Sequence, residues 1–463
     1  MGLFPDQNSS PRHYHRIKWL GLGVGCLAKF VTGSLFVFNV YEDAIKNTFN
    51  YTETEVQLQS SLLNIGLGFG FIPGKFYDNF GPQWASLGGV IVSVLAYTLL
   101  WSTPKYVSFY QDKSWLMAIY FFLSGLGSVF TYMVALNTNV INFDEKHRGK
   151  IVGLLNAFFA GSPSIFAVIY YHVIGDPTST ESFSTFMLLF AIAFGVTDVI
   201  CMFFLRIYTK PTELLEQREM KTQVSSESNN SSSCCDSVSK GRRNEGTPLR
   251  ELLQNADYYI FTLMFTFASC VGLVYVIALT QTTNSMGFSS HNPDVVLIVP
   301  IVNALISVCI GVFSDHFRER LPRLAILIAG STSFVVCQVL IVTLAAEYTW
   351  IVMATIFCGI GVGLIWSIAP TIMSEYFDVA NLGRNWGIAL FLGSLVGLGA
   401  QESFGAFYDA AKTHSSDIDC FGIECVRKGH AVALASGIVS IILGVTLYFK
   451  RRNSNQNAFQ RFE

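Results

Sequence analysis

Twelve long apolar runs constrain this chain more than any other feature of its sequence. A run of about 20 mostly apolar residues can cross about 30 Å of hydrocarbon as an α-helix, which rises 1.5 Å per residue. Lipid offers no partners for backbone N–H and C=O groups, so spanning segments are helices or barrel strands, and these runs are too long and too uniformly apolar for strands. The predicted spans are 17–41, 56–73, 83–101, 115–139, 150–173, 183–208, 257–283, 294–313, 322–344, 349–374, 384–408 and 430–449.

The composition supports this class. Charged residues make up 13% of the chain and apolar residues 51%, whereas a soluble domain carries about 25% charged residues. The deficit is explained if much of the surface faces lipid. Ten cysteines are scattered, mostly within apolar runs, so they do not form a disulfide framework. We therefore predict an all-α polytopic membrane protein.

A polar stretch between the sixth and seventh runs divides the chain into six spans plus six. Residues 225–233 read Ser-Ser-Glu-Ser-Asn-Asn-Ser-Ser-Ser, which cannot bury enough apolar surface to fold by itself. The expected organisation is a tail over 1–16, a six-helix bundle over 17–208, a disordered linker over 209–256, a second six-helix bundle over 257–449 and a tail over 450–463.

Lysine and arginine are concentrated in the loops on one side of the predicted membrane, including the tails and the linker. The opposite loops hold only Lys46, Lys105, Lys113, Lys412, Arg427 and Lys428. Because cytoplasmic loops carry the excess of basic residues, both termini and the linker are expected in the cytosol. The protein is expected in a plasma membrane or an endomembrane, and the charge bias does not distinguish these two.

Two features fall in the predicted outer loops. The sequon Asn50-Tyr51-Thr52 lies in the first of them, where Asn50 can be glycosylated. Cys420 and Cys425 lie in the last of them and are close enough in sequence to form a small disulfide.

The loops that follow the second and the eighth spans repeat a pattern. One contains Gly74 and Asp78, and the other contains Gly311 and Asp315, each pair spaced as Gly-x-x-x-Asp. Arg148 follows Asp78 by 70 residues, and Arg384 follows Asp315 by 69. Glycine allows close helix approach, and a carboxylate can cap a helix N-terminus or pair with a base. We expect a duplicated six-helix unit whose six repeated residues gate the cytosolic side.

Short blocks along nearly the whole chain carry a family resemblance. They are Gly33-Ser34-Leu35-Phe36-Val37-Phe38 with Tyr41, Asn142-Phe143 with Arg148-Gly149 and Val152-Gly153-Leu154, Asn303 with Ser314-Asp315, Gly383-Arg384-Asn385-Trp386-Gly387, and Cys420-Phe421-Gly422-Ile423-Glu424-Cys425. With the Gly-x-x-x-Asp loops, these blocks resemble the major facilitator superfamily. Within it, they resemble the nodulin-like branch, which is related to the monocarboxylate and oxalate:formate transporters.

The resemblance implies two pseudo-symmetric six-helix bundles around a central cavity, with alternating access to the two sides. It does not imply a substrate. Related anion carriers often place an arginine four residues after the asparagine that corresponds to Asn303, and here that position is Ser307. The resemblance therefore supplies no cation in this helix for a carboxylate substrate.

Lys29 is the cation nearest the middle of a predicted span. Charges inside a bilayer are costly, so they are candidates for function. Lys29 can bind an anionic group of a substrate or pair with an acid that takes up a proton. Alternatively, its long stem can reach the interface, or its charge can form a structural pair.

Asp198 and Glu402 are the acids of interest for ion coupling, since either carboxyl would titrate nearer neutrality if buried. Each can equally have a structural role. Polar residues within the spans are candidates for the substrate cavity, although many such groups simply bond between helices. They are Asn39, Tyr41, Asn64, Tyr132, Asn137, Asn156, Tyr275, Gln281, Asn303, Trp366 and Gln401.

The sequence contains no P-loop, no His-Glu-x-x-His and no Gly-x-Ser-x-Gly motif. We therefore expect no enzyme activity, no cofactor and no metal site, and no partner beyond a small-molecule substrate and the lipid bilayer. Nucleic-acid binding is not expected, and the chain is expected to be a monomer. The leading hypothesis is a secondary active transporter of a small polar or organic-anion solute, which proton coupling could drive. The alternative is a non-transporting sensor or receptor on the same fold.

Overall fold

The computed structural model describes residues 11–175, 179–208, 247–412 and 420–459, and the regular elements within them are helices. The first half of the chain forms α1 (Pro11–Gly33), η1 (Ser34–Val37), α2 (Phe38–Phe49), α3 (Glu53–Gly68), α4 (Phe71–Phe80), α5 (Pro82–Ser102), η2 (Thr103–Tyr106), α6 (Val107–Tyr110), α7 (Ser114–Asn142), η3 (Glu145–His147), α8 (Arg148–Ile169), η4 (Tyr170–Ile174) and α9 (Thr180–Phe204).

The second half forms α11 (Leu249–Leu252), α12 (Ala256–Ser285), η6 (Ser289–His291), α13 (Asn292–His316), α14 (Arg323–Leu344), α15 (Tyr348–Tyr376), η7 (Val379–Asn381), α16 (Leu382–Lys412) and α17 (Glu424–Phe459). Within the described residues, eleven helical segments are long and apolar enough to cross a membrane. The twelfth predicted span, 56–73, is present as α3 and α4, which are too short to qualify separately because the helix is interrupted at Phe69 and Gly70.

Local sequence signals explain several helix ends. Thr52 begins α3 with a capping box, in which its side chain accepts from the Glu55 backbone N–H and Glu55 bonds back to the Thr52 backbone. Gly81 ends α4 with a φ of +85°, a conformation that glycine adopts without strain. Pro82 then starts α5, where a missing N–H costs nothing.

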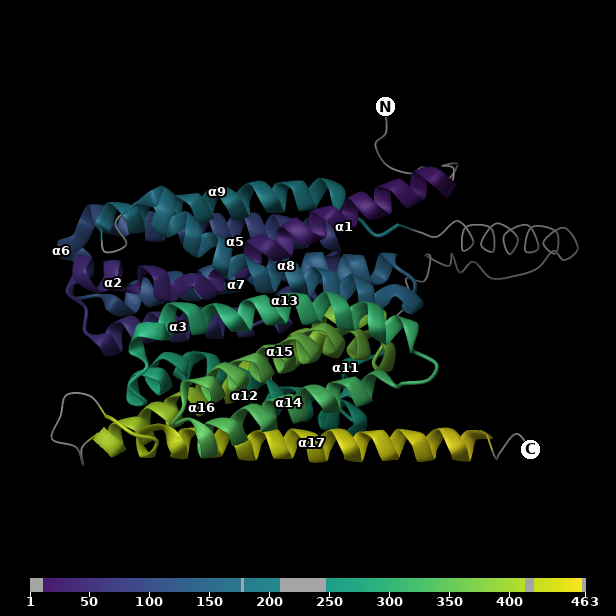
Figure 1. Ribbon diagram of the computed structural model, residues 1–463. Helices are drawn as coiled ribbons and strands as arrows, with labels where there is room; N and C mark the ends of the chain where they lie inside the picture. Colours follow the sequence, from purple (N-terminus) through teal and green to yellow (C-terminus); the bar gives the residue numbers. More distant parts are fainter. Residues whose placement is uncertain (1–10, 176–178, 209–246, 413–419, 460–463) are drawn as a thin grey trace, which may run out of the picture.

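The helices form two bundles that lie side by side, with α9 along one edge of the molecule and α17 along the opposite edge (Figure 1). One apolar core lies among α2, α7 and α9, around Tyr41, Phe121 and Phe186. The larger core surrounds Phe265 and Phe334 in the second bundle. The bundles meet chiefly where α8 packs on α13 and where α16 packs on α3 and α4.

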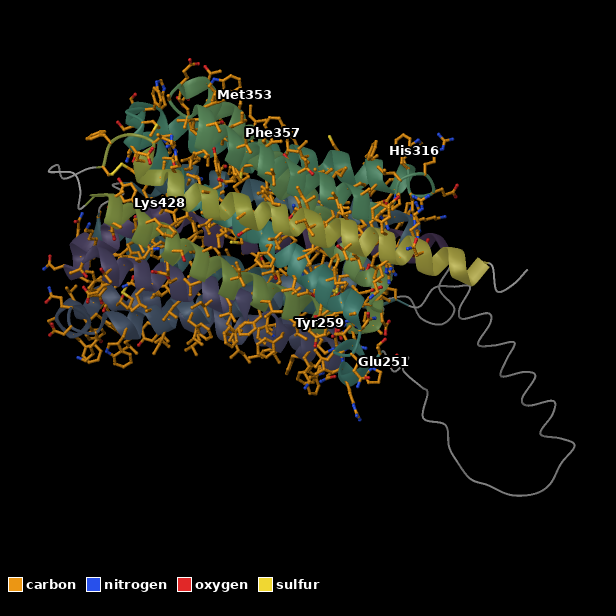
Figure 2. The ribbon with its side chains drawn as sticks, turned by 90° about the horizontal axis from the view of Figure 1, so that it is seen from below. Glu251, Tyr259, His316, Met353, Phe357 and Lys428 are labelled. Carbon is orange, nitrogen blue, oxygen red and sulfur yellow. A yellow bond between two sulfur atoms is a disulfide. The ribbon has the colours of Figure 1, made fainter. Side chains whose placement is uncertain are left out.

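The start of α1 and the ends of α9 and α17 lie at one end of the molecule, which we call the linker end (Figure 1). We call the other end the disulfide end, because Cys420 and Cys425 are bonded there. Figure 2 shows Lys428 at the disulfide end and Glu251 and His316 at the linker end.

The segment expected to be a disordered linker is shorter than predicted at its second boundary. Its last residues, 247–256, are described and contain α11 and the first residue of α12. They fold because Leu252 is buried in the core of the second bundle, and because backbone groups of Thr247 bond to that bundle. Residues 209–246 lie outside the described residues.

Candidate functional site

Lys29 lies in α1 with its side chain enclosed near the middle of the molecule. The residue is 3% exposed, and its Nζ is 2.9 Å from the centroid of the Tyr132 ring and 5.6 Å from that of Phe159. Within the described part of the chain, no Asp or Glu pairs with it. A cation–π contact recovers about 0.5–2 kcal/mol, which is less than the cost of burying a charge. The Lys29 amine is therefore buried without an acidic partner among the described residues.

Polar side chains from both bundles meet around Asn156 in α8. Its Nδ2 donates to Ser307 Oγ at 2.8 Å and lies 3.4 Å from both Asn303 Oδ1 and Ser367 Oγ. Asn156 lies one helical turn from Phe159, and Phe159 contacts the Tyr132 ring that covers Lys29. The amide cluster and the cation are thus neighbours, and the cluster joins α8 to α13 and α15.

Aromatic rings form the remaining wall. The Trp386 indole N–H donates to the Tyr132 hydroxyl at 3.3 Å across the two bundles. Trp386 also contacts Phe265 and Trp366, with ring centroids 4.8 and 6.3 Å away. A single cation, amide groups and aromatic rings are what an amphipathic anion needs, since the rings offer apolar contact and the polar groups fix orientation.

The structure brings together five of the predicted binding residues, namely Lys29, Tyr132, Asn156, Asn303 and Trp366. Four predicted residues lie nearer the disulfide end, ten or more positions along the chain from the central-site residue of the same span. They are Asn39, Tyr275, Gln281 and Gln401. Tyr275 bonds to Thr355 within the second bundle, whereas Asn39 and Gln281 are exposed. Tyr41 packs against Phe38, Phe121, Phe183 and Phe186 inside the first bundle. Asn64 is half-buried, and Asn137 lies beside Gly383.

The two acids predicted for coupling have different surroundings. Asp198 is fully buried among helices of the first bundle, where one oxygen accepts from Thr131 at 3.0 Å and the other has no partner. A Cβ on Gly89 would lie 2.7 Å from this carboxylate, so the fit is tight. Glu402 is exposed on α16. Neither acid contacts Lys29.

The two aspartates of the repeated loops each bind the start of a helix in the opposite bundle. Asp78 accepts from the backbone N–H groups of Gly383 and Arg384 at 3.1 and 2.7 Å. Asp315 accepts from those of Gly149 and Lys150 at 3.0 and 2.8 Å. Both acceptors satisfy N–H groups that a helix leaves unpaired in its first turn, and their charge favours the positive end of the helix dipole. The linker end is closed by these contacts.

This geometry corrects the predicted equivalence of Arg148 and Arg384. Arg384 is the third residue of α16 and Arg148 the first residue of α8, so the counterpart of Arg384 is Lys150. The aspartates bind backbone groups instead of the arginine side chains. The Arg148 guanidinium lies 3.5 Å from Ser374 O, and that of Arg384 donates to Thr247 O at 2.9 Å.

We call the contacts of Asp78 and Asp315 with the opposite helix starts the gate. Glycines allow the helix backbones to approach closely there. A Cβ added to Gly74 would lie 2.0 Å from Gly383 O, and one added to Gly311 would lie 2.5 Å from Gly149 O. Real Cβ atoms do not approach that closely, so side chains at these positions would separate the bundles. The predicted role of Gly74 and Gly311 in close approach therefore has a geometric basis.

The gate is asymmetric in its side-chain partners. Asp315 pairs with Arg323 at 2.5 Å, Arg323 also contacts Glu375, and Arg318 reaches Glu145 across the bundles at 2.5 Å. Asp78 lies past the predicted span, at the end of α4, and its hydrogen-bond donors among the described residues are the two backbone N–H groups. Burial raises the pKa of its carboxyl to about 7, although the two N–H groups act in the opposite direction.

Acidification should stabilise the closed linker end. The pKa of Asp78 in the closed state lies above its ordinary value, so the closed state binds a proton more tightly than a state with Asp78 in water. Closure should therefore strengthen as pH falls through about 7 and weaken as pH rises above it. The measurement is the alkylation rate of a thiol placed by Ser314→Cys, because Ser314 is 1% exposed at the contact with Gly149.

Asp78→Asn is the control for that pH dependence, because an amide does not titrate in this range. The alkylation rate of Ser314→Cys is divided at each pH by that of the double variant Ser314→Cys/Asp78→Asn. This ratio removes the intrinsic titration of the thiol. A ratio that does not change between pH 5.5 and 8.5 would exclude Asp78 as the titrating group.

Asp78→Ala and Asp315→Ala should both slow transport more than they lower expression.

Four residues of the central site were not predicted from sequence: Phe159, Ser307, Ser367 and Trp386. Phe159 and Trp386 resemble the other aromatic residues of the spans, and small serines are common in packed membrane helices. These four residues lie on α8, α13, α15 and α16, so their closeness to one another could be recognised only with the helix packing known. Asn50 is exposed at the end of α2, and Cys420 and Cys425 are joined by a 2.05 Å S–S bond.

Comparison with known proteins agrees with this architecture. The model of the Major Facilitator Superfamily matches residues 22–400. The chain belongs to the major facilitator superfamily. Its curated relatives include "Uncharacterized MFS-type transporter YhjX" of Escherichia coli, 23% identical over 84% of this chain and 87% of the relative. They also include "Probable transporter MCH1" of Yarrowia lipolytica, 23% identical over 94% and 95%.

Solved structures of this superfamily share the fold. The proton:xylose symporter XylE matches with a TM-score of 0.68, 15% identity and coverage of 92% of this chain and 95% of the other. The transporter FucP in an outward conformation matches with a TM-score of 0.60, 12% identity and coverage of 93% and 99%. The protein is thus a multi-pass membrane protein with two six-helix bundles and a transporter fold, and this class is not one of enzymes.

Proposed function

We propose that this protein carries a small organic anion across a membrane by alternating access, with Lys29 as the group that holds the anion. The observation that carries the proposal is the buried side chain of Lys29, which has no acidic partner among the described residues. A buried amine is costly to keep charged without a counter-ion, and packing alone does not need an amine at this position. An anionic substrate supplies the missing charge while it is bound.

The surroundings of Lys29 favour a monoanion with an apolar body. One cation balances one carboxylate, and the rings of Tyr132 and Phe159 line the same space. The amide cluster around Asn156 can bind a hydroxyl or keto oxygen of the substrate, because its bonds to Asn303 and Ser367 are long at 3.4 Å.

The movement that this mechanism needs is a rocking of the two bundles. In the closed arrangement Asp78 and Asp315 hold α16 and α8, and the glycine contacts keep the backbones together. Breaking these contacts would open the central site to the linker end. We propose that the linker end faces the cytosol, because the basic residues are concentrated there.

Flux through purified protein in liposomes tests the proposal. We expect saturable uptake of labelled monocarboxylates, and weaker uptake of dicarboxylates and of neutral sugars such as xylose or fucose. The sugars are included because XylE and FucP are described as proton symporters of these solutes. Binding of an anion without any flux would favour the alternative of a sensor on the same fold.

Proton coupling is proposed to depend on Glu402 rather than on Asp198. A coupling group must be reachable by protons, and Glu402 has exposed surface on α16, the helix that carries Trp386. Asp198 is enclosed within one bundle. We expect Glu402→Gln to lose anion accumulation driven by an imposed pH gradient while keeping anion exchange, and we expect Asp198→Asn to keep both. Gradient-driven accumulation in Glu402→Gln would rule out this assignment.

A further inference from the structure

The end of the segment that joins the two bundles is attached directly to the gate. The Thr247 backbone N–H donates to Asp378 Oδ2 at 3.0 Å. The Thr247 carbonyl accepts from Arg384 Nη2 at 2.9 Å, and Asn381 Nδ2 lies 3.4 Å from it. Arg384 is also the residue whose backbone N–H binds Asp78 of the first bundle. Thr247 is therefore linked through Arg384 to the contact with Asp78, which joins the two bundles at the linker end.

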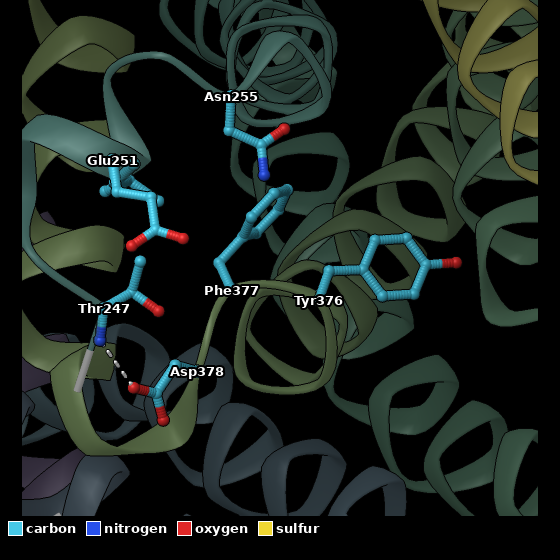
Figure 3. Close-up of a pocket in the computed structure, with 7 residues that line it drawn as sticks. Thr247, Glu251, Asn255, Tyr376, Phe377 and Asp378 are labelled. Atoms are coloured by element: carbon cyan, nitrogen blue, oxygen red, sulfur yellow. Dashed lines mark hydrogen bonds between the residues drawn. The ribbon is translucent and has the colours of Figure 1, made fainter. Parts of the chain in front are cut away.

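Thr247 lines an open pocket with two carboxylates beside it. The pocket has about 140 Å³ of free space, enough for a phosphoryl group, and the other lining residues include Glu251, Asn255, Tyr376 and Asp378. Figure 3 shows Thr247 between the side chains of Glu251 and Asp378, with the hydrogen bond to Asp378 drawn as a dashed line. Any negative charge added to Thr247 would meet both acids.

The Thr247 side chain is available for modification. It is half-buried, and the next three residues, Pro248, Leu249 and Arg250, are exposed. Its hydroxyl has no hydrogen-bond partner among the described residues. A threonine followed by proline is the dipeptide that proline-directed protein kinases modify. The adjacent gate contact uses the backbone of Thr247, whereas the group that a kinase phosphorylates is the side-chain hydroxyl.

We propose that Thr247 is a phosphorylation site whose modification opens the linker end. A kinase transfers the γ-phosphoryl group of ATP to Thr247 Oγ, so that a P–O bond to the threonine forms, the bond to the β-phosphate breaks and ADP leaves. The hydroxyl proton passes to the base of the kinase. The consequence for flux rests on the proposed transport function, whereas the modification and the opening do not.

The direction of the effect follows from the charges. The phosphate adds about −1.5 to −2 charge at neutral pH, and it lies next to Glu251 and Asp378. Among the described residues, Arg384 is the cation that bonds to Thr247, and its guanidinium already donates to Thr247 O and to Asn385 Oδ1. Repulsion from two acids therefore outweighs attraction to one shared base. The segment leaves Asp378, Arg384 loses its carbonyl partner, and the start of α16 is held less firmly against Asp78.

The first experiment asks whether the site reacts. The purified full-length protein is incubated with a proline-directed kinase and ATP, and the phosphate is located by mass spectrometry. We expect it on Thr247, and we expect that signal to vanish in Thr247→Ala. A synthetic peptide of residues 241–254 serves as the control substrate. Modification of the peptide, but not of the folded protein, would overturn the proposal.

The second experiment measures opening without using transport. In the Ser314→Cys background, the phosphorylated protein and the Thr247→Glu variant should be alkylated about five- to tenfold faster than the unmodified protein, as expected for the loss of one ordinary hydrogen bond. Thr247→Gln, which has no charge, should react at the unmodified rate. Glu251→Gln should reduce the effect of Thr247→Glu, because one repelling charge is gone.

Two results would contradict the proposed direction. One is phosphorylation of Thr247 with no change in the alkylation rate. The other is acceleration in Thr247→Gln as large as in Thr247→Glu, which would mean that side-chain size, and not charge, loosens the segment. Failure of the liposome flux assay would remove the proposed transport function and would leave both of these measurements intact.

Discussion

Lys29→Met is expected to abolish saturable uptake of an organic anion and to make the substrate-free protein more stable. Methionine keeps the unbranched apolar stem and removes the charge that Tyr132 and Phe159 surround. Leaving one member of a buried charge pair without its partner costs about 3 kcal/mol, so the affinity for the anion should fall about 100-fold. Without substrate, the same change removes an uncompensated buried cation, and the melting temperature should rise by roughly 2 °C or more.

Binding measured by calorimetry and a thermal melt on the same preparation test both parts. Lys18→Met is the matched control, because Lys18 lies in the same helix and over the ring of Phe143 at 4.5 Å, outside the central cluster. It should leave the anion affinity within about threefold of the original, as for substitutions away from a binding site. Unchanged affinity in Lys29→Met would exclude Lys29 as the anchor. A lower melting temperature would show that its charge has a structural partner.

Gly74→Ala is expected to shift the protein strongly towards the open linker end. The added Cβ would lie 2.0 Å from Gly383 O, which is backbone and cannot move independently of α16. Overpacking a tight contact costs about 1–3 kcal/mol, which changes the ratio of open to closed molecules by about 5- to 150-fold. Alkylation of the thiol introduced by Ser314→Cys should accelerate accordingly, and transport should slow because closure becomes difficult.

Gly161→Ala is the control for Gly74→Ala. Gly161 is also a helical glycine, in α8, but no heavy atom lies within 4 Å of the position its Cβ would take. This variant gains the same methyl group and the same helix propensity, about 1 kcal/mol in favour of alanine. It should react and transport at the original rates. Equal rates in Gly74→Ala and the original protein would show that the contact between Gly74 and Gly383 does not hold the bundles together.

Much of the fold could be predicted from sequence because lipid restricts the backbone to few solutions. The apolar runs correspond to helices, and the polar stretch separates two bundles. The interruption of the second span at Phe69 and Gly70 was not predicted, because nothing in an apolar run shows where a helix stops bonding to itself. The folding of residues 247–255 was also missed, because their order depends on contacts with distant residues such as Asp378 and Arg384.

The central site was predictable in part. Lys29 was identified because a charge in an apolar run is conspicuous, and Asn156 and Asn303 because amides there are uncommon. Sequence could not show that Tyr41 faces the interior of one bundle or that Trp386 contacts Tyr132. Those facts depend on how each helix is rotated about its axis. The repeated glycines and aspartates lie where the bundles meet at the linker end, and each aspartate binds a helix start as the sequence suggested, whereas the expected pairing with the arginine side chains is not seen.

The use of main-chain amides by Asp78 and Asp315 has a consequence for how this protein can change over time. Every amino acid except proline supplies the same N–H group, so positions 149, 150, 383 and 384 can exchange charge and polarity freely as far as these hydrogen bonds are concerned. Size remains restricted at the two glycines. Divergent homologues can therefore keep these four hydrogen bonds while having different amino acids at positions 150 and 384. A proline at any of the four positions would remove one of the bonds.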